Sequence, residues 1–413
     1  MADKSRDISV VVVGGSYAGA AAARKLADLS KKGYPGLKVT LVDEKSHYFH
    51  AIGFPKSLVD GKYASKSFLP FSAFFEAGTQ HQFVNSRLHA VTDAHHLELE
   101  NGQQLYFDYL VLATGGKAPG PINVSATGKD DGLAEIERLR TGLENADSVL
   151  VIGGGAVGVE VTGFVAAAFP QKKVTLVHSG KRLLPANFRE GVSNGAVAKL
   201  GQLGVNVVLN ERIELPEDFG HAAHIGPQVL SGASGAEYSS DVQILAVGFK
   251  VNSAFLEPLE AKLGSLLHIE DGPGFIRVRP TLQLDSDAFP NIFVPGDAND
   301  LPMTAKYGFK AEMQGGTTAA NIKKLIDSGF DQAFVRSQQQ QRSSSVEVPP
   351  LSKWSDMLDA ILVPIGPDLG VAQMLKVALG CSGIGNFIVR QLKTKDFMLW
   401  MRKGYFPNKQ QIN

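Results

Sequence analysis

The sequence predicts an α/β protein with two Rossmann-like units and a smaller C-terminal region. An apolar run leads twice into a glycine-rich turn and a helix of small residues, at VVVVGGSYAG (10–19) and at VLVIGGGAVG (149–158). Each helix is followed by a second β-branched run, LKVTLVDEK (37–45) and KKVTLVHSG (172–180). Strand, glycine turn, helix and parallel strand in this order make a βαβ unit. The repetition indicates two such units rather than one chance match.

The composition limits the size, the partners and the location of the protein. With 413 residues and 44 glycines, the chain is long enough for more than one domain and suits a fold with many tight turns. Its 41 acidic and 41 basic residues cancel, so no nucleic-acid partner is expected. No apolar run approaches the ~20 residues of a membrane-spanning helix. The N-terminus MADKSRD has no signal-peptide or transit-peptide character, and Ala2 stands where N-myristoylation requires glycine. We therefore expect a cytoplasmic protein.

The first glycine turn is an incomplete dinucleotide-binding motif. Gly14 permits the tight turn and Gly19 permits close packing of helix on strand, but Ser16 replaces the glycine beside which a pyrophosphate normally passes. The serine hydroxyl could itself face a phosphate at the helix N-terminus. Taken alone, this turn is equally consistent with a nucleotide site and with plain strand–helix packing. The candidate binding residues are Gly14, Gly15, Ser16, Tyr17, Ala18 and Gly19.

The second turn resolves the first, because Gly153, Gly155 and Gly158 complete the G-x-G-x-x-G motif at the same place in a matching unit. We therefore predict two dinucleotide sites. The strand after the first helix ends at Asp43, an acid suited to the hydroxyls of an adenosine ribose. The corresponding strand of the second unit ends at His178.

His178 is followed by Ser179, Lys181 and Arg182, so no carboxylate would repel a 2′-phosphate at the second site. These basic residues also suit a solvated loop. Either NADH or NADPH could be the co-substrate.

Three more strands are predicted by apolar runs that end in small residues. They are FDYLVLATGG (107–116), SDVQILAVGF (240–249) and FPNIFVPGDAND (289–300), and the last is followed by the helix AEMQGGTTAANIKKL (311–325).

The order of these motifs resembles the two-dinucleotide-binding flavoprotein superfamily, which includes ferredoxin reductases and disulfide reductases. Within it, the chain most resembles the family of ferroptosis-suppressor-like and apoptosis-inducing-factor-like NAD(P)H:quinone oxidoreductases. The matching stretches are VDEKSHYFHAIGFPKSLV, VIGGGAVGVE, KKVTLVHSG, VGFKVNSAF, NIFVPGDA and the tail IGPDLGVAQ…RQLKTKDF. The resemblance implies an FAD domain, residues 1–122 and 251–335, split by an inserted NAD(P)H domain, residues 123–250. A polar linker (336–349) and a C-terminal domain (350–413) would follow.

The resemblance also implies roles for individual residues. The FAD site would include the first turn with Asp43, Glu44, Lys45, Ala113, Thr114, Gly115, Asp297, Phe309, Met313 and Gln314. The NAD(P)H site would include Gly153, Gly155, Ala156, Val157, Gly158, His178, Ser179, Arg182 and Gly248. Glu160, on the helix after the second turn, and Lys56, in HAIGFPKSL, are the catalytic candidates, and we expect them to form a pair beside the flavin. No metal site is expected.

The single cysteine, Cys381, rules out a dithiol–disulfide relay within the chain. A diffusing acceptor must then come to the flavin, and the resemblance implies a quinone. Two alternatives remain open at this stage. One is reduction of another one-electron acceptor, and the other is a slowly turning-over, apoptosis-inducing-factor-like signalling flavoprotein.

The C-terminal segment 386–413 combines basic and apolar residues. Its six basic residues, against the single acid Asp396, are Arg390, Lys393, Lys395, Arg402, Lys403 and Lys409. They are interleaved with Phe387, Ile388, Leu392, Phe397, Met398, Trp400, Tyr405 and Phe406. This composition fits a domain packed over the flavin, and it also fits peripheral contact with an anionic membrane or lipid-droplet surface.

Overall fold

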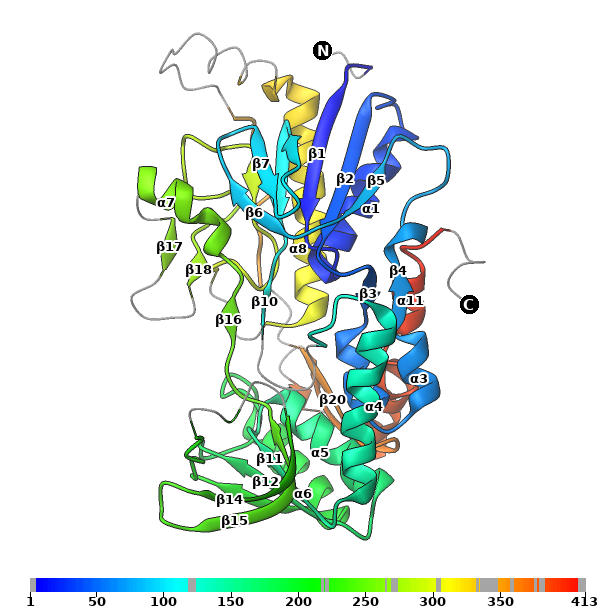
Figure 1. Ribbon diagram of the computed structural model, residues 1–413, viewed down its shortest axis with the longest axis vertical. Coiled ribbons are helices and arrows are strands. Elements are labelled where there is room, and N and C mark those ends of the chain that lie inside the picture. The colour runs from blue at the N-terminus through cyan, green and yellow to red at the C-terminus, as the bar shows by residue number, and fades with distance from the viewer. Residues whose placement is uncertain are drawn as a thin grey trace.

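The computed structural model describes residues 5–117, 124–216, 219, 223–263, 266–268, 274–301, 306–331, 334, 348–356, 360–374, 377–378 and 383–407. Two α/β bodies lie at opposite ends of an elongated molecule, and C-terminal elements lie between them (Figure 1). The predicted fold class, with two Rossmann-like cores, is confirmed. Among the described residues, none of the helices combines the length and the hydropathy of a membrane-spanning segment.

The first body contains a parallel sheet in the order β19-β9-β1-β2-β5. Its strands are β19 (Ile292–Phe293), β9 (Tyr109–Leu112), β1 (Ile8–Val13), β2 (Leu37–Asp43) and β5 (Gln82–Asn85). The alanines of α1 (Tyr17–Ser30) are buried and allow α8 (Gly308–Ser328) to pack closely beside it. Where the two helices touch, a Cβ on Gly315 of α8 would lie 2.1 Å from the carbonyl oxygen of Ala18 of α1. Small side chains therefore bring the N-termini of both helices close to the end of β1.

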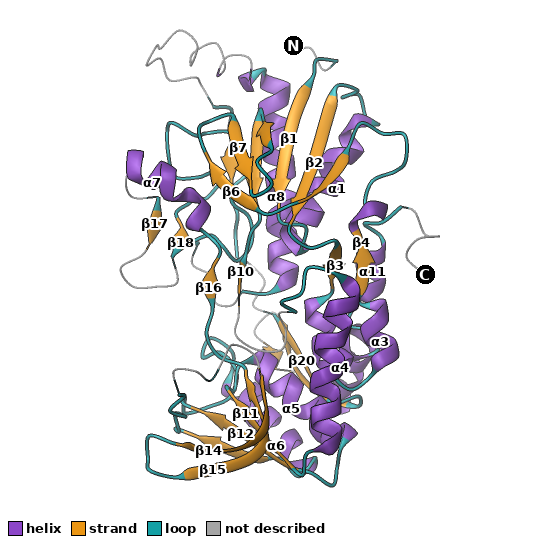
Figure 2. Ribbon diagram, in the orientation of Figure 1, coloured by secondary structure: helices purple, strands orange, loops and turns teal. Residues whose placement is uncertain are grey.

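Shorter elements complete the first body (Figure 2). An antiparallel sheet contains β6 (Leu88–Val91), β7 (His96–Leu99) and β8 (Gln104–Tyr106), and two small ribbons pair β3 (His47–Phe49) with β4 (Phe68–Pro70) and β17 (Leu267–His268) with β18 (Phe275–Ile276). Its short helix is α7 (Glu257–Leu263), whereas α2 (Phe54–Ser57) and α3 (Gly61–Lys66) contact helices of the second body.

The second body contains the sheet β13-β12-β11-β15-β14. β13 (Asn206–Leu209), β12 (Lys173–His178), β11 (Ser148–Ile152) and β15 (Glu237–Leu245) are parallel, and the edge strand β14 (Ala223–Ser231) is antiparallel to β15. The helices of this body are α4 (Lys129–Asn145), α5 (Ala156–Ala168) and α6 (Glu190–Gln202). Buried valine and leucine side chains on β11 and β12 form its core.

The chain passes between the bodies through two short strands that pair with each other. β10 (Gly116–Lys117) leads toward the second body and β16 (Lys250–Val251) returns from it, with Gly116 opposite Val251 in an antiparallel ladder (Figure 1).

The C-terminal sheet packs on the second body, and buried residues of the segment that follows it pack into the core of the first body. The sheet of β20 (Ile361–Ile365), β21 (Leu369–Met374) and β22 (Val377–Ala378) contacts α5 and α6, and a Cβ on Gly163 of α5 would lie 2.7 Å from Cα of Ile365. α10 (Gly383–Val389), a π-helical turn (Arg390–Thr394) and α11 (Leu399–Lys403) follow. Most of the predicted linker, residues 336–347, lies outside the described residues, as do Cys381 and Lys409.

Candidate active site

The first glycine turn joins β1 to α1 with the geometry that its glycines require. Gly14 has φ +92°, and a Cβ there would lie 2.3 Å from the carbonyl oxygen of Ala113. A Cβ on Gly19 would lie 1.7 Å from the carbonyl oxygen of Gly14, so neither position tolerates a side chain. Ser16 is exposed at the N-cap position, and its side chain makes no capping hydrogen bond. The hydroxyl is therefore not engaged by the helix, at the terminus where a phosphate would bind.

The second turn repeats this geometry between β11 and α5. Gly153 has φ +118°, and a Cβ on Gly158 would lie 1.8 Å from the carbonyl oxygen of Gly153. A Cβ on Gly155, which corresponds to Ser16, would meet no atom of the described chain within 4 Å. The approach to this turn is therefore open, as backbone contact with a pyrophosphate requires.

Asp43 and His178 occupy equivalent places in the two units. The backbone N–H of Gly15 donates to Oδ2 of Asp43 (2.6 Å), and the N–H of Gly154 donates to Nδ1 of His178 (3.1 Å). Burial raises the pKa of Asp43 to about 6, although the N–H groups of Gly15 and Lys45 oppose the shift. Burial lowers the pKa of His178, so its ring is neutral at pH 7. The two sites thus present an acid and a neutral imidazole at the same position.

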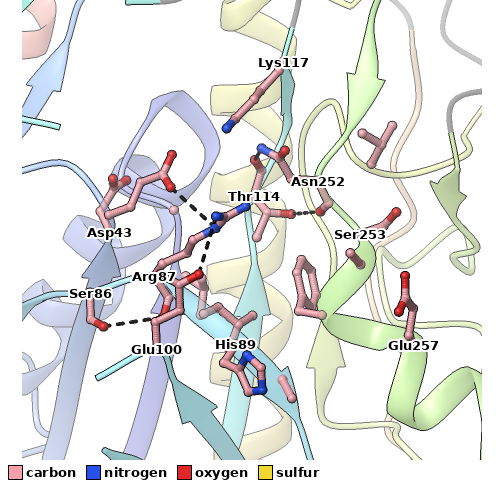
Figure 3. Close-up of a pocket in the computed structure, with 18 of the residues that line it drawn as sticks. Asp43, Ser86, Arg87, His89, Glu100, Thr114, Lys117, Asn252, Ser253 and Glu257 are labelled. Atoms are coloured by element: carbon pink, nitrogen blue, oxygen red, sulfur yellow. Dashed lines mark hydrogen bonds and ion pairs between the residues drawn. The ribbon is translucent and has the colours of Figure 1, made fainter. Parts of the chain in front are cut away.

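A pocket of about 650 Å³ lies beside Asp43, between the first sheet and the returning segment that follows β16 (Figure 3). Thr114 and Asn252 fix its wall, because Oγ1 of Thr114 donates to the Asn252 carbonyl (2.8 Å) and the Asn252 amide donates to the Thr114 carbonyl (3.1 Å). Arg87 lies between two carboxylates, 3.6 Å from Glu44 and 3.4 Å from Glu100. Thr114 and Glu44 were predicted site residues, whereas no motif marked Arg87.

Several predicted residues have structural partners. The Lys45 ammonium donates to the carbonyls of Val124 and Ala126, so it holds the start of the segment leading to the second body. Gln314 is fully buried and accepts from the Gly296 N–H (2.7 Å) and the Asn299 amide (2.8 Å). Phe309 stacks on Tyr307, while Met313 is exposed.

The remaining predicted residues lie at the ends of strands or in the turns. Ala113 and Gly115 follow β9, Gly248 follows β15 with φ +87°, and Ala156 and Val157 begin α5. Ser179 and Arg182 follow β12, and the Arg182 guanidinium donates to the carbonyl of Ala186.

Asp297 has the features of a ligand-binding carboxylate. Its Oδ1 is buried and has no hydrogen-bond partner in the described part of the chain. Burial raises its pKa, and the charge of Lys306 opposes that shift. A buried carboxylate oxygen without a donor is costly, so a hydroxylated ligand that donates to it would relieve the cost. Together with the open glycine turns, this oxygen shows that the residues fit a dinucleotide cofactor such as FAD.

The expected pair of Lys56 with Glu160 is wrong. The ammonium group of Lys56 donates to the carbonyl of Lys395 (2.7 Å), and the ammonium group of Lys393 lies 2.5 Å from the Glu160 carboxylate. Glu160 is buried and Lys393 is mostly covered, and Lys393 also donates to the carbonyl of Leu362 (3.0 Å). Burial raises the pKa of Glu160, while the charge of Lys393 lowers it.

Two buried groups in the same region were not predicted as site residues. His50 is fully buried, and Arg402, which forms an ion pair with Glu312 of α8, is nearly so. No sequence motif indicated that they belong to the site, because each has a partner that is distant in the sequence.

Comparison with known proteins agrees with this geometry. A model of the family described as pyridine nucleotide-disulphide oxidoreductase matches residues 8–315. The chain is 25% identical over 406 residues to apoptosis-inducing factor homolog B of Dictyostelium discoideum, with 94% of each chain covered. It is 26% identical over 401 residues to ferroptosis suppressor protein 1 of Homo sapiens, with 96% of this chain and 95% of the relative covered. The resemblance inferred from the motifs is confirmed.

Solved structures share the fold. The sulfide:quinone oxidoreductase of Aquifex aeolicus superposes with a TM-score of 0.66 at 16% identity, covering 96% of this chain and 92% of that one. A NAD-dependent persulfide reductase from A. fulgidus superposes with a TM-score of 0.64 at 20% identity, covering 89% and 64%. The chain therefore belongs to the pyridine nucleotide-disulphide oxidoreductase family, as an oxidoreductase that uses FAD with NAD(P)H as co-substrate.

Proposed function

We propose that the protein is an FAD-dependent NAD(P)H:quinone oxidoreductase without a redox-active disulfide. The observation that carries this proposal is the single cysteine among 413 residues, since one thiol cannot form the dithiol relay of a disulfide reductase. Bound FAD supplies the chemistry that accepts a hydride and passes on electrons. The acceptor must then reach the cofactor by diffusion. The family resemblance supports a quinone, and the Aquifex aeolicus protein of the same fold is itself a sulfide:quinone oxidoreductase.

In this proposal, residues 1–122 and 251–335 bind FAD and residues 123–250 bind NAD(P)H. Gly14 and Ser16 hold the pyrophosphate of FAD at the N-terminus of α1, and Asp43 accepts from its ribose hydroxyls. Asp297 accepts from a second hydroxyl through its unpartnered oxygen. The N-terminus of α8, which begins at Gly308, adds positive potential that favours a negatively charged reduced cofactor.

The second turn and His178 bind the coenzyme, and Glu160 is the acidic group closest along α5 to that turn. Glu160 pairs with Lys393, so its carboxylate can stay charged although it is buried. Without this partner, a buried carboxylate would be uncompensated. We assign the pair to orienting the nicotinamide end of the coenzyme. Lys56 has a positioning role, because its ammonium group holds the carbonyl of Lys395.

The C-terminal elements form the apolar wall on the acceptor side. Phe397 is buried against Phe164 of α5, with ring centroids 5.5 Å apart, and against Tyr63, at 6.4 Å. Such a wall excludes water from the electron-transfer region and suits an aromatic quinone head.

The proposal includes peripheral contact with an anionic lipid surface, where a hydrophobic quinone would be concentrated. Phe387, Leu392 and Trp400 are 63%, 50% and 66% exposed, although all three are large and apolar. The exposed cations that accompany them are Arg390 and Lys395. Basic and aromatic side chains together favour the interface of an anionic membrane.

One experiment tests the acceptor. The purified protein should be yellow, its flavin absorption should bleach with NADH or NADPH without oxygen, and added soluble quinone should restore the colour rapidly. A disulfide substrate should not restore it. Cys381→Ser is the matched control and should keep the full rate, because no thiol takes part. Quinone turnover that is lost in this variant, or a reduced protein that persists in the presence of quinone, would contradict the proposal.

A second experiment tests the assignment of Asp297. Asp297→Ala should weaken FAD retention by about 1.5–3 kcal/mol, because it removes a charged hydrogen-bond acceptor. Asp300→Ala, three residues further along the same loop, is the comparison variant. Equal FAD affinity in wild type and Asp297→Ala would show that Asp297 does not contact the cofactor.

A further inference from the structure

The buried side chain of His50 connects the C-terminal segment to the first glycine turn. His50 follows β3 and is fully buried. Its Nε2 lies 2.8 Å from the carbonyl oxygen of Phe397, and its Nδ1 lies 3.2 Å from the hydroxyl oxygen of Tyr17. These two partners are 380 residues apart in the sequence, counting from 17 to 397.

The partners fix the direction of each hydrogen bond. A carbonyl oxygen can only accept, so Nε2 of His50 must carry the hydrogen and Nδ1 must be the acceptor. The Tyr17 hydroxyl therefore donates to Nδ1, and its oxygen in turn accepts from the backbone N–H of Ile52 (3.0 Å). Because burial lowers the pKa of His50 to about 3, the ring stays neutral and this arrangement holds at physiological pH.

Tyr17 is the first residue of α1, directly after Ser16 of the glycine turn. Its ring lies against the start of α8, since a Cβ on Gly308 would approach that ring to 3.3 Å. The guanidinium carbon of Arg402 lies 5.0 Å from the centroid of the Tyr17 ring. Tyr17 therefore lies between the two helix N-termini that converge on the candidate FAD site.

The C-terminal segment is held at three successive carbonyls. Lys56 donates to Lys395 (2.7 Å), Tyr63 donates to Asp396 (2.8 Å) and His50 donates to Phe397. The backbone is strained at Phe397, the third of these residues, and at Met398, with φ values of +53° and +62°. Non-glycine residues adopt this conformation only when their surroundings impose it. Side chains of residues 50–63 therefore help to hold this segment in a conformation that its own residues disfavour.

We propose that His50 is a positioning residue which transmits the placement of the C-terminal segment to Tyr17 and so to the turn that holds FAD. This inference rests on the proposed binding of FAD at the first turn. A loosened C-terminal segment would release His50, then Tyr17, and FAD would leave more easily.

The test measures release of FAD from the holoprotein by recovery of flavin fluorescence, together with the thermal midpoint of the apoprotein. Tyr17→Phe keeps the ring and removes only the hydroxyl, and His50→Leu keeps a similar volume but removes both the donor for Phe397 and the acceptor for Tyr17. Each should release FAD about three- to tenfold faster, the range expected for loss of the one hydrogen bond that joins His50 to Tyr17. The double variant should be no faster than either single variant, because both break the same connection.

Tyr34→Phe is the matched control, since its buried hydroxyl donates to Asp327 (2.6 Å) away from the turn, and its FAD release should equal that of wild type. Tyr63→Phe, which frees the Asp396 carbonyl, should speed release in the wild-type background but not in His50→Leu. Additive effects, or a fall in the apoprotein midpoint with unchanged FAD release, would overturn the inference. A wild type that binds no FAD would instead refute the proposed function, so the two failures are distinct.

Discussion

The ammonium group of Lys393 and the carboxylate of Glu160 lie 2.5 Å apart, although the residues are separated by 233 positions in the sequence. Their side chains are only 13% and 6% exposed, so each charge is stabilised mainly by the other rather than by water. The pair connects the C-terminal segment with the helix that follows the second glycine turn.

Lys393→Met should destabilise the protein by about 3 kcal/mol or more, because it leaves a buried carboxylate without its counter-ion. Adding Glu160→Gln should recover much of this loss, since the uncompensated charge is then absent. Urea unfolding at pH 7 measures both variants. A double variant as unstable as Lys393→Met would show that packing of the lysine stem, rather than charge, determines the stability.

The affinity for FAD should rise with pH around the titration of Asp43. The pKa of Asp43 is raised to about 6, so its protonated form persists well above the usual pH range of an aspartate. In the apoprotein this ionisation costs stability as pH increases from about 4 through 6. The ionised form is the better acceptor for ribose hydroxyls, so binding should strengthen from pH 5 to pH 7. Titration of apoprotein with FAD at several pH values measures this change, and Asp43→Asn should abolish it.

The protein should discriminate little between NADH and NADPH. The neutral ring of His178 stands where an acid would repel a 2′-phosphate. His178→Glu should penalise NADPH by a few kcal/mol at most and leave NADH nearly unaffected. The ratio of kcat/KM values for the two coenzymes reports this directly. If the wild-type protein already disfavours NADPH by orders of magnitude, the 2′-phosphate of the coenzyme does not lie beside His178.

The intact protein should bind anionic vesicles reversibly, and salt should weaken the binding because exposed charges are screened within ~10 Å at ~0.1 M. In the sequence, Lys393 and Arg402 are among the basic residues of a candidate membrane-binding surface. In the structure they form ion pairs with Glu160 and Glu312 and are mostly covered, so they are unsuitable for a surface test. Charge reversal at the exposed residues Arg390 and Lys395 should abolish vesicle binding while soluble quinone is still reduced. Co-sedimentation measures this, and absence of wild-type binding at low salt would favour a purely packed domain.

The fold could be predicted because its determinants are local. The turns at Gly14 and Gly153 need positive φ and close helix packing, and both requirements are visible as glycine spacing. The partners of Glu160 and His50 could not be predicted in this way. Lys393 lies in a basic, aromatic run that also suits a solvated surface, and only the packing of β20 on α5 brings it to Glu160.

The ladder between β10 and β16 has a consequence for protein engineering. Because Gly116 faces Val251, the chain leaves the first body and re-enters it at neighbouring points. The intervening segment could therefore be removed and the cut ends joined by a short peptide without rethreading the first sheet. Such a shortened protein would separate flavin retention from coenzyme binding. The C-terminal sheet, which packs on α5 and α6, would have to be removed along with the segment, since it would otherwise be left with an uncovered apolar face.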